Sequence, residues 1–248
     1  MSGLWDRTHN VVVLTIGMLV FWQALYLYAG DAALSSPWTT FAFTANLVSG
    51  DMFWMHASES LRAFAFALAI AAGIGLTLGF WLGLHKLANA VLAPVLVSVA
   101  SIPKITLYPI VLLVFGLGMP AKVAFGAFHG ITPIALFTIG AVTNIRPVLL
   151  KVGRLQKLGP LSMVARVLFP AALPEIFTGL RVGFSVTLIG TLLGEMFAAQ
   201  RGLGYLLMTA IGLHNVNLIM AIALLVTTFA AAFSGLLLTI DRRIRSRY

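Results

Sequence analysis

Residues 144–175 read NIRPVLLKVGRLQKLGPLSMVARVLFPAALPE, and the rest of the chain must be arranged around them. Charge is dense in this stretch, apolar runs flank it, and no acidic residue occurs before Glu175. Its five basic residues are Arg146, Lys151, Arg154, Lys157 and Arg166. Because Lys and Arg gather in the cytoplasmic loops of membrane proteins, the stretch is predicted to form a docking surface that faces the cytoplasm.

Four prolines divide the stretch into short pieces. Proline suits the first position of a helix, where its missing N–H has no partner to lose, so Pro147 and Pro160 are predicted to begin two short helices. Pro170 and Pro174 are predicted to end the second helix and to open the next apolar run. The first helix would be amphipathic, with Val148, Val152 and Leu155 on one side and Lys151, Arg154 and Lys157 on the other.

Composition places the chain in the membrane. Of its 248 residues, 60% are apolar and only 9% are charged, whereas about a quarter of a soluble domain is charged. The mean hydropathy is +1.01. The net charge of +9 does not indicate nucleic-acid binding, because the basic residues cluster at the ends of apolar runs. The absence of cysteine excludes disulfides and thiolate metal sites. We therefore predict an all-α polytopic membrane protein.

Six transmembrane helices are predicted from the apolar runs. The run at 87–121 holds four prolines and could be one bent span or two spans. Lys86 and the basic stretch should both be cytoplasmic, so an even number of crossings separates them, and 87–121 must supply one crossing beside 123–145. Both termini are then cytoplasmic. The predicted spans are 10–30, 63–84, one within 87–121, 123–145, 176–194 and 216–240.

The remaining segments follow from this topology. Residues 1–56 form an N-terminal helix and an outer linker, part of which (38–49) could lie flat on the membrane, 57–240 form the core, and 241–248 form a basic cytoplasmic tail. Lys122, Arg62 and Arg201 are exceptions on the outer side. Arg181 and Glu195 are interpreted as boundary residues of one helix, with Glu195 in an outer connection, and no polar residues are expected to converge inside the membrane.

A stripe of glycines marks the fifth predicted span. The spacing of Gly179, Gly183, Gly190 and Gly194 by four, seven and four residues places them on one helical face. Two such Gly-x-x-x-Gly pairs let another helix approach closely. The alternative is that membrane helices are simply rich in glycine, and this chain has 23 glycines. The second span repeats the spacing at Gly75, Gly79 and Gly83.

Signatures of catalysis are absent from the sequence. The chain has no Walker-type phosphate loop, no Gly-x-Ser-x-Gly elbow and no His-Glu-x-x-His pair, so no catalytic or metal site is predicted. Lys104 lies midway through an apolar segment, where a charge costs about 2.5–3.5 kcal/mol. It could line a path for an anion, or the bend at Pro103 could bring it to an interface where it snorkels.

Three motifs carry a resemblance to a known family. They are SIPKITLYPIVLLVFGLG at 101–118, LFPAALPEIFTGLRVG at 168–183 and GEMFAAQRGLGYLL at 194–207. With these motifs the chain resembles permease subunits of bacterial ATP-binding-cassette importers, in the nitrate/sulfonate/taurine-type group of the binding-protein-dependent family. The resemblance begins at about residue 57 and covers nearly all of the chain from there.

The resemblance implies a role for the basic stretch. Residues 144–175 correspond to the family's EAA coupling loop, whose helix docks in a cleft of the ATPase subunit. An ungapped match places Lys151-Val152-Gly153 on the EAA triplet and Lys157 on the usual glycine, whereas a shift of two residues would use Gly159. The residues implied in coupling are Val148, Lys151, Val152, Gly153, Arg154, Leu155, Lys157, Gly159, Pro170 and Pro174.

The resemblance also implies partners and a fold. The implied fold is the type I importer fold, in the inner membrane. The implied partners are a second permease copy in a homodimer, two ATPase subunits that bind ATP and Mg²⁺, and a periplasmic or lipid-anchored binding protein. No cofactor is expected in this chain, which would not itself be an enzyme. The substrate would be a small anion of the nitrate, sulfonate, taurine or bicarbonate kind. The alternative, an ion-coupled secondary transporter, should have two related halves and intramembrane carboxylates.

Overall fold

The computed structural model describes residues 2–245, with side chains described for residues 9–159, 162–197 and 199–243. Within this range the secondary structure is helical, with no strand. The elements are α1 Ser2–Ala29, α2 Pro37–Val48, α3 Asp51–Leu84, α4 Lys86–Ser101, η1 Lys104–Leu107, α5 Tyr108–Phe115, α6 Met119–Thr143, α7 Pro147–Leu155, α8 Pro160–Met163, the π-helical segment η2 Val164–Leu168, α9 Phe169–Ala198, α10 Leu203–Gly212 and α11 Val216–Arg245. Residues 246–248 of the predicted basic tail lie outside the described range, as do the side chains of Arg7 and Arg245.

Five segments are long and apolar enough to cross a membrane, and one bent pair of helices passes the same test when its two parts are taken together. The five are His9–Ala29, Asp51–Leu84, Met119–Thr143, Val164–Phe197 and Val216–Arg243. α4 meets the η1–α5 segment at a bend of 90°. The eight residues of α5 extend only about 12 Å, so α5 cannot cross roughly 30 Å of hydrocarbon alone. The predicted all-α architecture is confirmed, and residues 87–121 contain a sharply bent helix pair and not two full spans.

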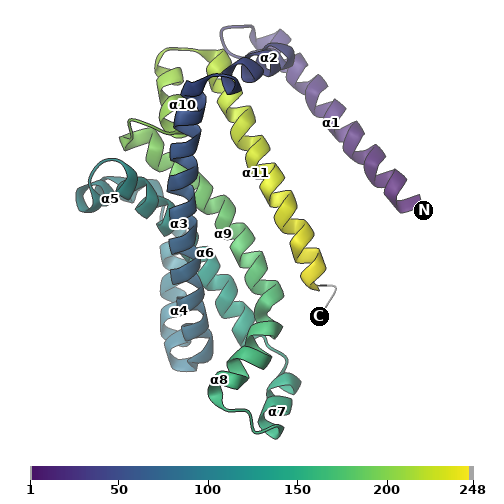
Figure 1. Cartoon of the computed structure of the whole chain (residues 1–248), viewed down its shortest axis with the longest axis vertical. Helices are drawn as coiled ribbons and strands as arrows, with labels where there is room; N and C mark the ends of the chain where they lie inside the picture. The colour runs from purple at the N-terminus through teal and green to yellow at the C-terminus, as the bar shows by residue number, and fades with distance from the viewer. Residues whose placement is uncertain (1, 246–248) are drawn as a thin grey trace.

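α6 forms the centre of the bundle and packs along its length against α3 and α9 (Figure 1). Small residues allow α3 to come close. A Cβ atom at Gly75 would lie 2.8 Å from the Ile134 side chain, and one at Gly83 would lie 2.6 Å from Val142. Between membrane helices, where lipid is as apolar as leucine, such close packing supplies much of the association energy.

Three predicted helix boundaries are wrong. α3 begins at Asp51 and not at 63, so it is 34 residues long and extends beyond the hydrocarbon on at least one side. Pro170 does open α9, in whose first turn it lies, but neither Pro170 nor Pro174 halts the preceding helix, because the helical backbone continues through η2 into α9. The π-helical segment η2 immediately before Pro170 widens the backbone, and such local adjustments let a membrane helix accommodate proline. Residues 203–212, expected in a connection, form helix α10.

The two ends of the bundle carry different structures (Figure 1). α7 and α8 lie at one end, and α2 and α10 lie at the opposite end. α1 leans away from the bundle and is joined to it through α2. At that junction the Trp22 indole donates to the Ser35 carbonyl oxygen (3.0 Å), and the Ser35 hydroxyl donates to Asn217 of α11 (2.6 Å). Because each end of the α6–α9 pair carries its own short helices, both ends are candidate sites.

Candidate functional site

The loop between α6 and α9, residues 144–168, presents an apolar stripe to its surroundings; we call it the basic loop. On α7, the side chains of Val148, Val152 and Leu155 are 67%, 44% and 82% exposed. Lys151 and Arg154 on the same short helix are exposed as well. Three apolar side chains within three helical turns, bordered by cations, form a surface suited to a partner with an apolar centre and an acidic rim.

The opposite side of α7 is fastened to the bundle. A Cβ atom at Gly153 would lie 2.5 Å from the Met163 sulfur, so glycine lets α7 pack directly on the chain that leads into α9. Leu150 packs against a buried cluster that includes Ile145 and Leu168. α7 is thus held on the segment that leads into α9 while its stripe stays uncovered.

Lys157 ends α7 in a left-handed conformation, with φ of +52°. Its N–H donates to the Arg154 carbonyl oxygen (2.9 Å), and the next N–H donates to that of Gly153 (3.2 Å), as at many helix C-termini. Glycine is favoured at such a position. Gly159 has no comparable positive φ. Of the two positions that the resemblance offers for the family's glycine, Lys157 therefore has the left-handed backbone that favours glycine, and Gly159 does not.

A groove of about 650 Å³ separates the basic loop from the adjoining ends of α6 and α9. Arg146, Arg166 and Glu175 supply charged groups to its lining, and Pro170 and Pro174 line it as well. Glu175 leans on α6, because a Cβ atom at Gly140 would lie 3.1 Å from its Oε1 atom. The two prolines are therefore wall residues of this groove and not helix ends.

The glycine stripe of α9 lies against α6 along its length. A Cβ atom at Gly179 would lie 2.5 Å from Phe137, one at Gly190 would lie 2.7 Å from the His129 ring, and one at Gly194 would lie 3.0 Å from the Lys122 backbone. At Gly183 the added atom would collide with Ile134. We call this contact the glycine seam; it joins the two helices that border the basic loop.

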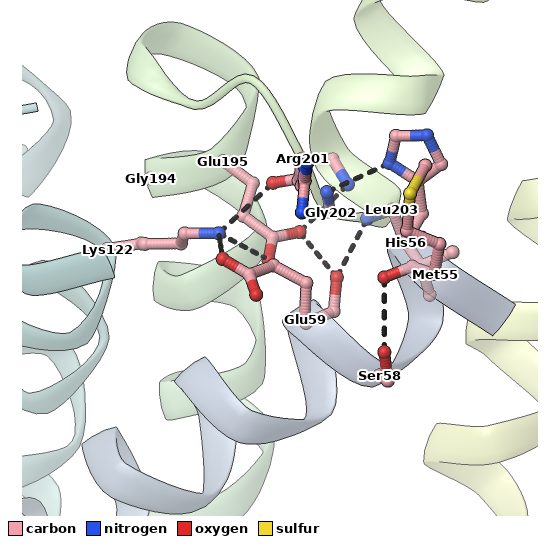
Figure 2. A network of polar contacts seen from close by, with 12 residues as sticks. Met55, His56, Ser58, Glu59, Lys122, Gly194, Glu195, Arg201, Gly202 and Leu203 are labelled. Carbon is pink, nitrogen blue, oxygen red and sulfur yellow. Dashed lines mark hydrogen bonds and ion pairs between the residues drawn. The ribbon is translucent and has the colours of Figure 1, made fainter. Parts of the chain in front are cut away.

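A buried ionic cluster (Figure 2) lies beside the start of α10, at the end of the bundle opposite α7 and α8 (Figure 1). The Lys122 ammonium, on a side chain that is 2% exposed, is 3.0 Å from Glu59 of α3 and 3.7 Å from Glu195 of α9. It also donates to the Arg201 carbonyl oxygen at 3.0 Å. One lysine in the first turn of α6 therefore connects α3, α9 and the turn before α10. We call this group, with His56 and Ser60, the outer polar cluster, after the side on which the predicted topology places it.

The same cluster holds the first residues of α10. The backbone N–H groups of residues 202–204 point at buried side chains, and Figure 2 shows those of Gly202 and Leu203. They donate in turn to His56 Nδ1 (3.1 Å), Ser60 Oγ (2.7 Å) and Glu195 Oε2 (3.0 Å). Ser60 also donates to Glu195 Oε2 at 2.7 Å. The first N–H groups of a helix have no intrahelical partner, so these side chains satisfy donors that burial would otherwise leave unpaired.

The expectation that no polar residues converge is therefore wrong. Glu195 is fully buried inside α9 and is not in an outer connection, and Lys122 is a buried, paired cation and not an exposed exception. The available signal was that an ionisable residue in an apolar run is a functional hypothesis by default, with a partner to be sought. Glycine is required where the turn meets Glu195, because a Cβ atom at Gly202, which has φ of +125°, or at Gly204 would collide with that side chain.

Lys104 lies at the bend between α4 and α5. It is the first residue of η1, half-buried, and its ammonium lies 3.5 Å from the Ala100 carbonyl oxygen. Nearby, the Tyr108 hydroxyl donates to the Gly194 carbonyl oxygen at 2.6 Å, which fixes the start of α5 on α9. Within the side chains that the structure describes, no group of three or more His, Asp or Glu residues is placed to hold a metal ion.

The sequence matches the family model described as the binding-protein-dependent transport system inner membrane component, over residues 75–246. The chain belongs to this family. One relative is the riboflavin transport system permease protein RibX of Chloroflexus aurantiacus, which is 32% identical over 225 residues covering 89% of this chain and 84% of RibX. Another is the nitrate import permease protein NrtB of a Synechocystis species, 28% identical over 230 residues covering 89% of this chain and 82% of NrtB.

A solved structure shows that this permease-family chain has the fold of a known importer. It superposes on a chain of the inward-facing MetNI methionine ABC transporter with a TM-score of 0.69 and 20% identity. The match covers 78% of this chain and 97% of that chain. Membership of the permease family and the type I importer fold, both expected from the motifs, are confirmed.

Proposed function

We propose that this permease docks ATP-binding-cassette ATPase subunits on its basic loop and opens a path for a small solute across the inner membrane. The observation that carries the proposal is the exposed stripe of Val148, Val152 and Leu155 on a helix whose other side packs against Met163 and the π-helical segment that leads into α9. A coupling helix must expose a contact surface and yet be held rigidly, because a flexible lever would lose its stroke. α7 meets both requirements.

The charge of the basic loop defines the partner surface. The loop carries five basic residues and no acidic one. We expect two ATPase subunits, each presenting acidic side chains around an apolar cleft, and ATP and Mg²⁺ bound by those subunits and not by this chain. A second copy of the permease completes the path in a homodimer, and a binding protein delivers the solute at the end that carries α10.

We propose a small anion as the solute. A permease relative is named for nitrate import, and Lys104 places a cation at the bend of the α4–α5 span. Another relative is named for riboflavin transport, so the family accommodates other chemistry and the binding protein must make much of the selection. Uptake assays with nitrate, bicarbonate, taurine and an alkanesulfonate distinguish these solutes. Uptake driven by an ion gradient without ATP would favour the secondary-transporter alternative.

Association with the ATPase tests the proposal directly. The permease, tagged and purified from native membranes, should retain an ATP-binding-cassette ATPase in equal amounts, with hydrolysis that vanadate inhibits. Purification of the permease alone, from membranes in which that ATPase is abundant, would contradict the proposal.

The topology gives an independent prediction. The basic loop, the N-terminus and the C-terminal tail should share the cytoplasmic side, because the basic residues gather there. Gln156 is exposed at the end of α7, and the chain has no native cysteine. A thiol introduced by Gln156→Cys should react with an impermeant maleimide only after the cells are opened. Reaction in intact cells would place the basic loop outside and overturn the topology.

A further inference from the structure

We propose that Lys122 is the positioning residue through which movement of the basic loop reaches the start of α10 at the opposite end of the molecule. The inference rests on the proposed function, because it takes the basic loop as the point where ATPase motion enters. It goes further by assigning a role to a buried charge cluster that lies far from the ATPase contact.

The first step is that α6 and α9 can move as one body. The basic loop joins the end of α6 to the start of α9, so displacing the loop displaces both helices. Between Lys122 and the loop, 22 residues of α6 span about 33 Å. The glycine seam leaves no free space along this length, because an added Cβ atom at any of its four glycines would lie within 3.0 Å of α6. Close-packed interiors transmit displacement and do not absorb it.

The second step is that Lys122 connects the far end of the α6–α9 pair to α3 and to the turn before α10. Its ammonium contacts Glu59 on α3, Glu195 on α9 and the Arg201 carbonyl oxygen in the turn (Figure 2). Glu195 Oε1 has no hydrogen-bond donor among the described residues, so the ammonium at 3.7 Å is the group that balances it. If the ammonium moved away, the fully buried Glu195 carboxylate would lose its cation, which favours one arrangement of the cluster.

The third step is that the cluster sets the direction of α10. The N–H groups of residues 202–204 all donate to the cluster, and Lys122 holds the carbonyl oxygen immediately before them. His56 also stacks on Tyr205 in the first turn of α10, with ring centroids 5.9 Å apart. Without Lys122, Glu59 and Glu195 would be neighbouring carboxylates with no cation between them. We therefore infer that the turn would detach from α6 and that α10 would no longer follow the α6–α9 pair.

The experiment measures movement of α10 in the complex of the permease with its native ATPase, in lipid nanodiscs. Gly212, at the end of α10, is exposed and has no atom within 4 Å of an added Cβ. The thiol introduced by Gly212→Cys is labelled with a maleimide, with and without ATP plus vanadate, which traps the ATPase. In the otherwise native chain we expect trapping to change the labelling rate about fivefold, the low end of typical allosteric coupling. In the Lys122→Met background the ratio should fall to about one, while ATP hydrolysis persists.

Two further variants separate positioning from charge neutralisation and folding. Lys122→Met with Glu195→Gln removes one charge of each sign and keeps an oxygen to accept from Gly204; it should assemble and still lack the response. Recovery of the response in this double variant would mean that Lys122 only neutralises Glu195, which overturns the proposal. Arg62→Met removes an exposed cation two residues beyond Ser60 and should keep the response. If Arg62→Met also lost the response, the inference would be overturned, because the loss would not be specific to Lys122.

The remaining outcomes separate this inference from the proposed function. A response retained in Lys122→Met overturns the inference, and so does an active ATPase with no response in the otherwise native chain. In both cases the proposed function stands. Failure of the permease to retain any ATPase contradicts the proposed function itself. If the Lys122→Met permease does not assemble with the ATPase, the labelling response of the double variant decides. No response supports the inference, and a response overturns it.

Discussion

Replacing Val152 and Leu155 together with glutamate is expected to abolish transport while the permease still inserts in the membrane. Both side chains are exposed on α7, so the substitution leaves the packing of α7 on Met163 and Ile145 unchanged. In the complex, each carboxylate would be buried without a cation, opposite a partner surface expected to be acidic. Central apolar contacts contribute about 2 kcal/mol or more each, so ATPase affinity should fall about a thousandfold.

Co-purification of the ATPase and solute uptake measure this effect. A suitable control is Leu213→Glu, which adds a carboxylate at an equally exposed apolar position at the other end of the bundle and should leave ATPase association intact. Full association and transport in the double variant would show that the basic loop has no coupling role. If the double variant failed to insert in the membrane, the basic loop would instead act by fixing the orientation of the chain in the membrane.

Leucine at Gly183 or Gly190 should prevent stable assembly. At Gly183 the first added carbon already collides with Ile134, and at Gly190 it would lie 2.7 Å from the His129 ring. Neither neighbour can retreat easily, because Ile134 and His129 are themselves buried within α6. Overpacking costs about 1–3 kcal/mol for smaller additions, so leucine should reach about 3 kcal/mol or more.

Thermal stability of the purified protein, followed by size-exclusion chromatography, gives the measurement. Gly212→Leu is the matched control, because an added Cβ there meets no atom within 4 Å, and it should retain nearly the native midpoint. Equal tolerance at all three positions would mean that the glycine seam is ordinary membrane composition and carries no packing requirement.

The helices of the basic loop were predictable because the signals are local. Pro147 begins α7 and Pro160 begins α8, as the preference of proline for the first helical turn requires. Pro170 follows the same rule, because it lies in the first turn of α9. The expectation that Pro170 and Pro174 halt the preceding helix failed, because the π-helical segment keeps the helical backbone continuous into α9. Lone prolines in membrane helices are therefore weak boundary signals.

The sequence marks Lys122 and Glu195 as ionisable residues beside apolar runs, but it does not show that they meet. Glu59, Lys122 and Glu195 are 63 and 73 residues apart along the chain, and each lies close to the end of its own apolar run. A boundary position is where an exposed charge is also expected, so pattern alone could not distinguish solvated from buried groups. Only the crossing of α3, α6 and α9 decides that the three side chains meet.

The sequence by itself determined the membrane class, the helical architecture, the basic loop and the family. These depend on hydropathy, charge position and short motifs, which are properties of neighbouring residues. The tertiary structure alone decided which helix the glycines of α9 face, where α3 begins and which charges are buried together. Those features depend on how helices distant in sequence pack, since a buried lysine such as Lys122 is stable only where other helices bring carboxylates to it.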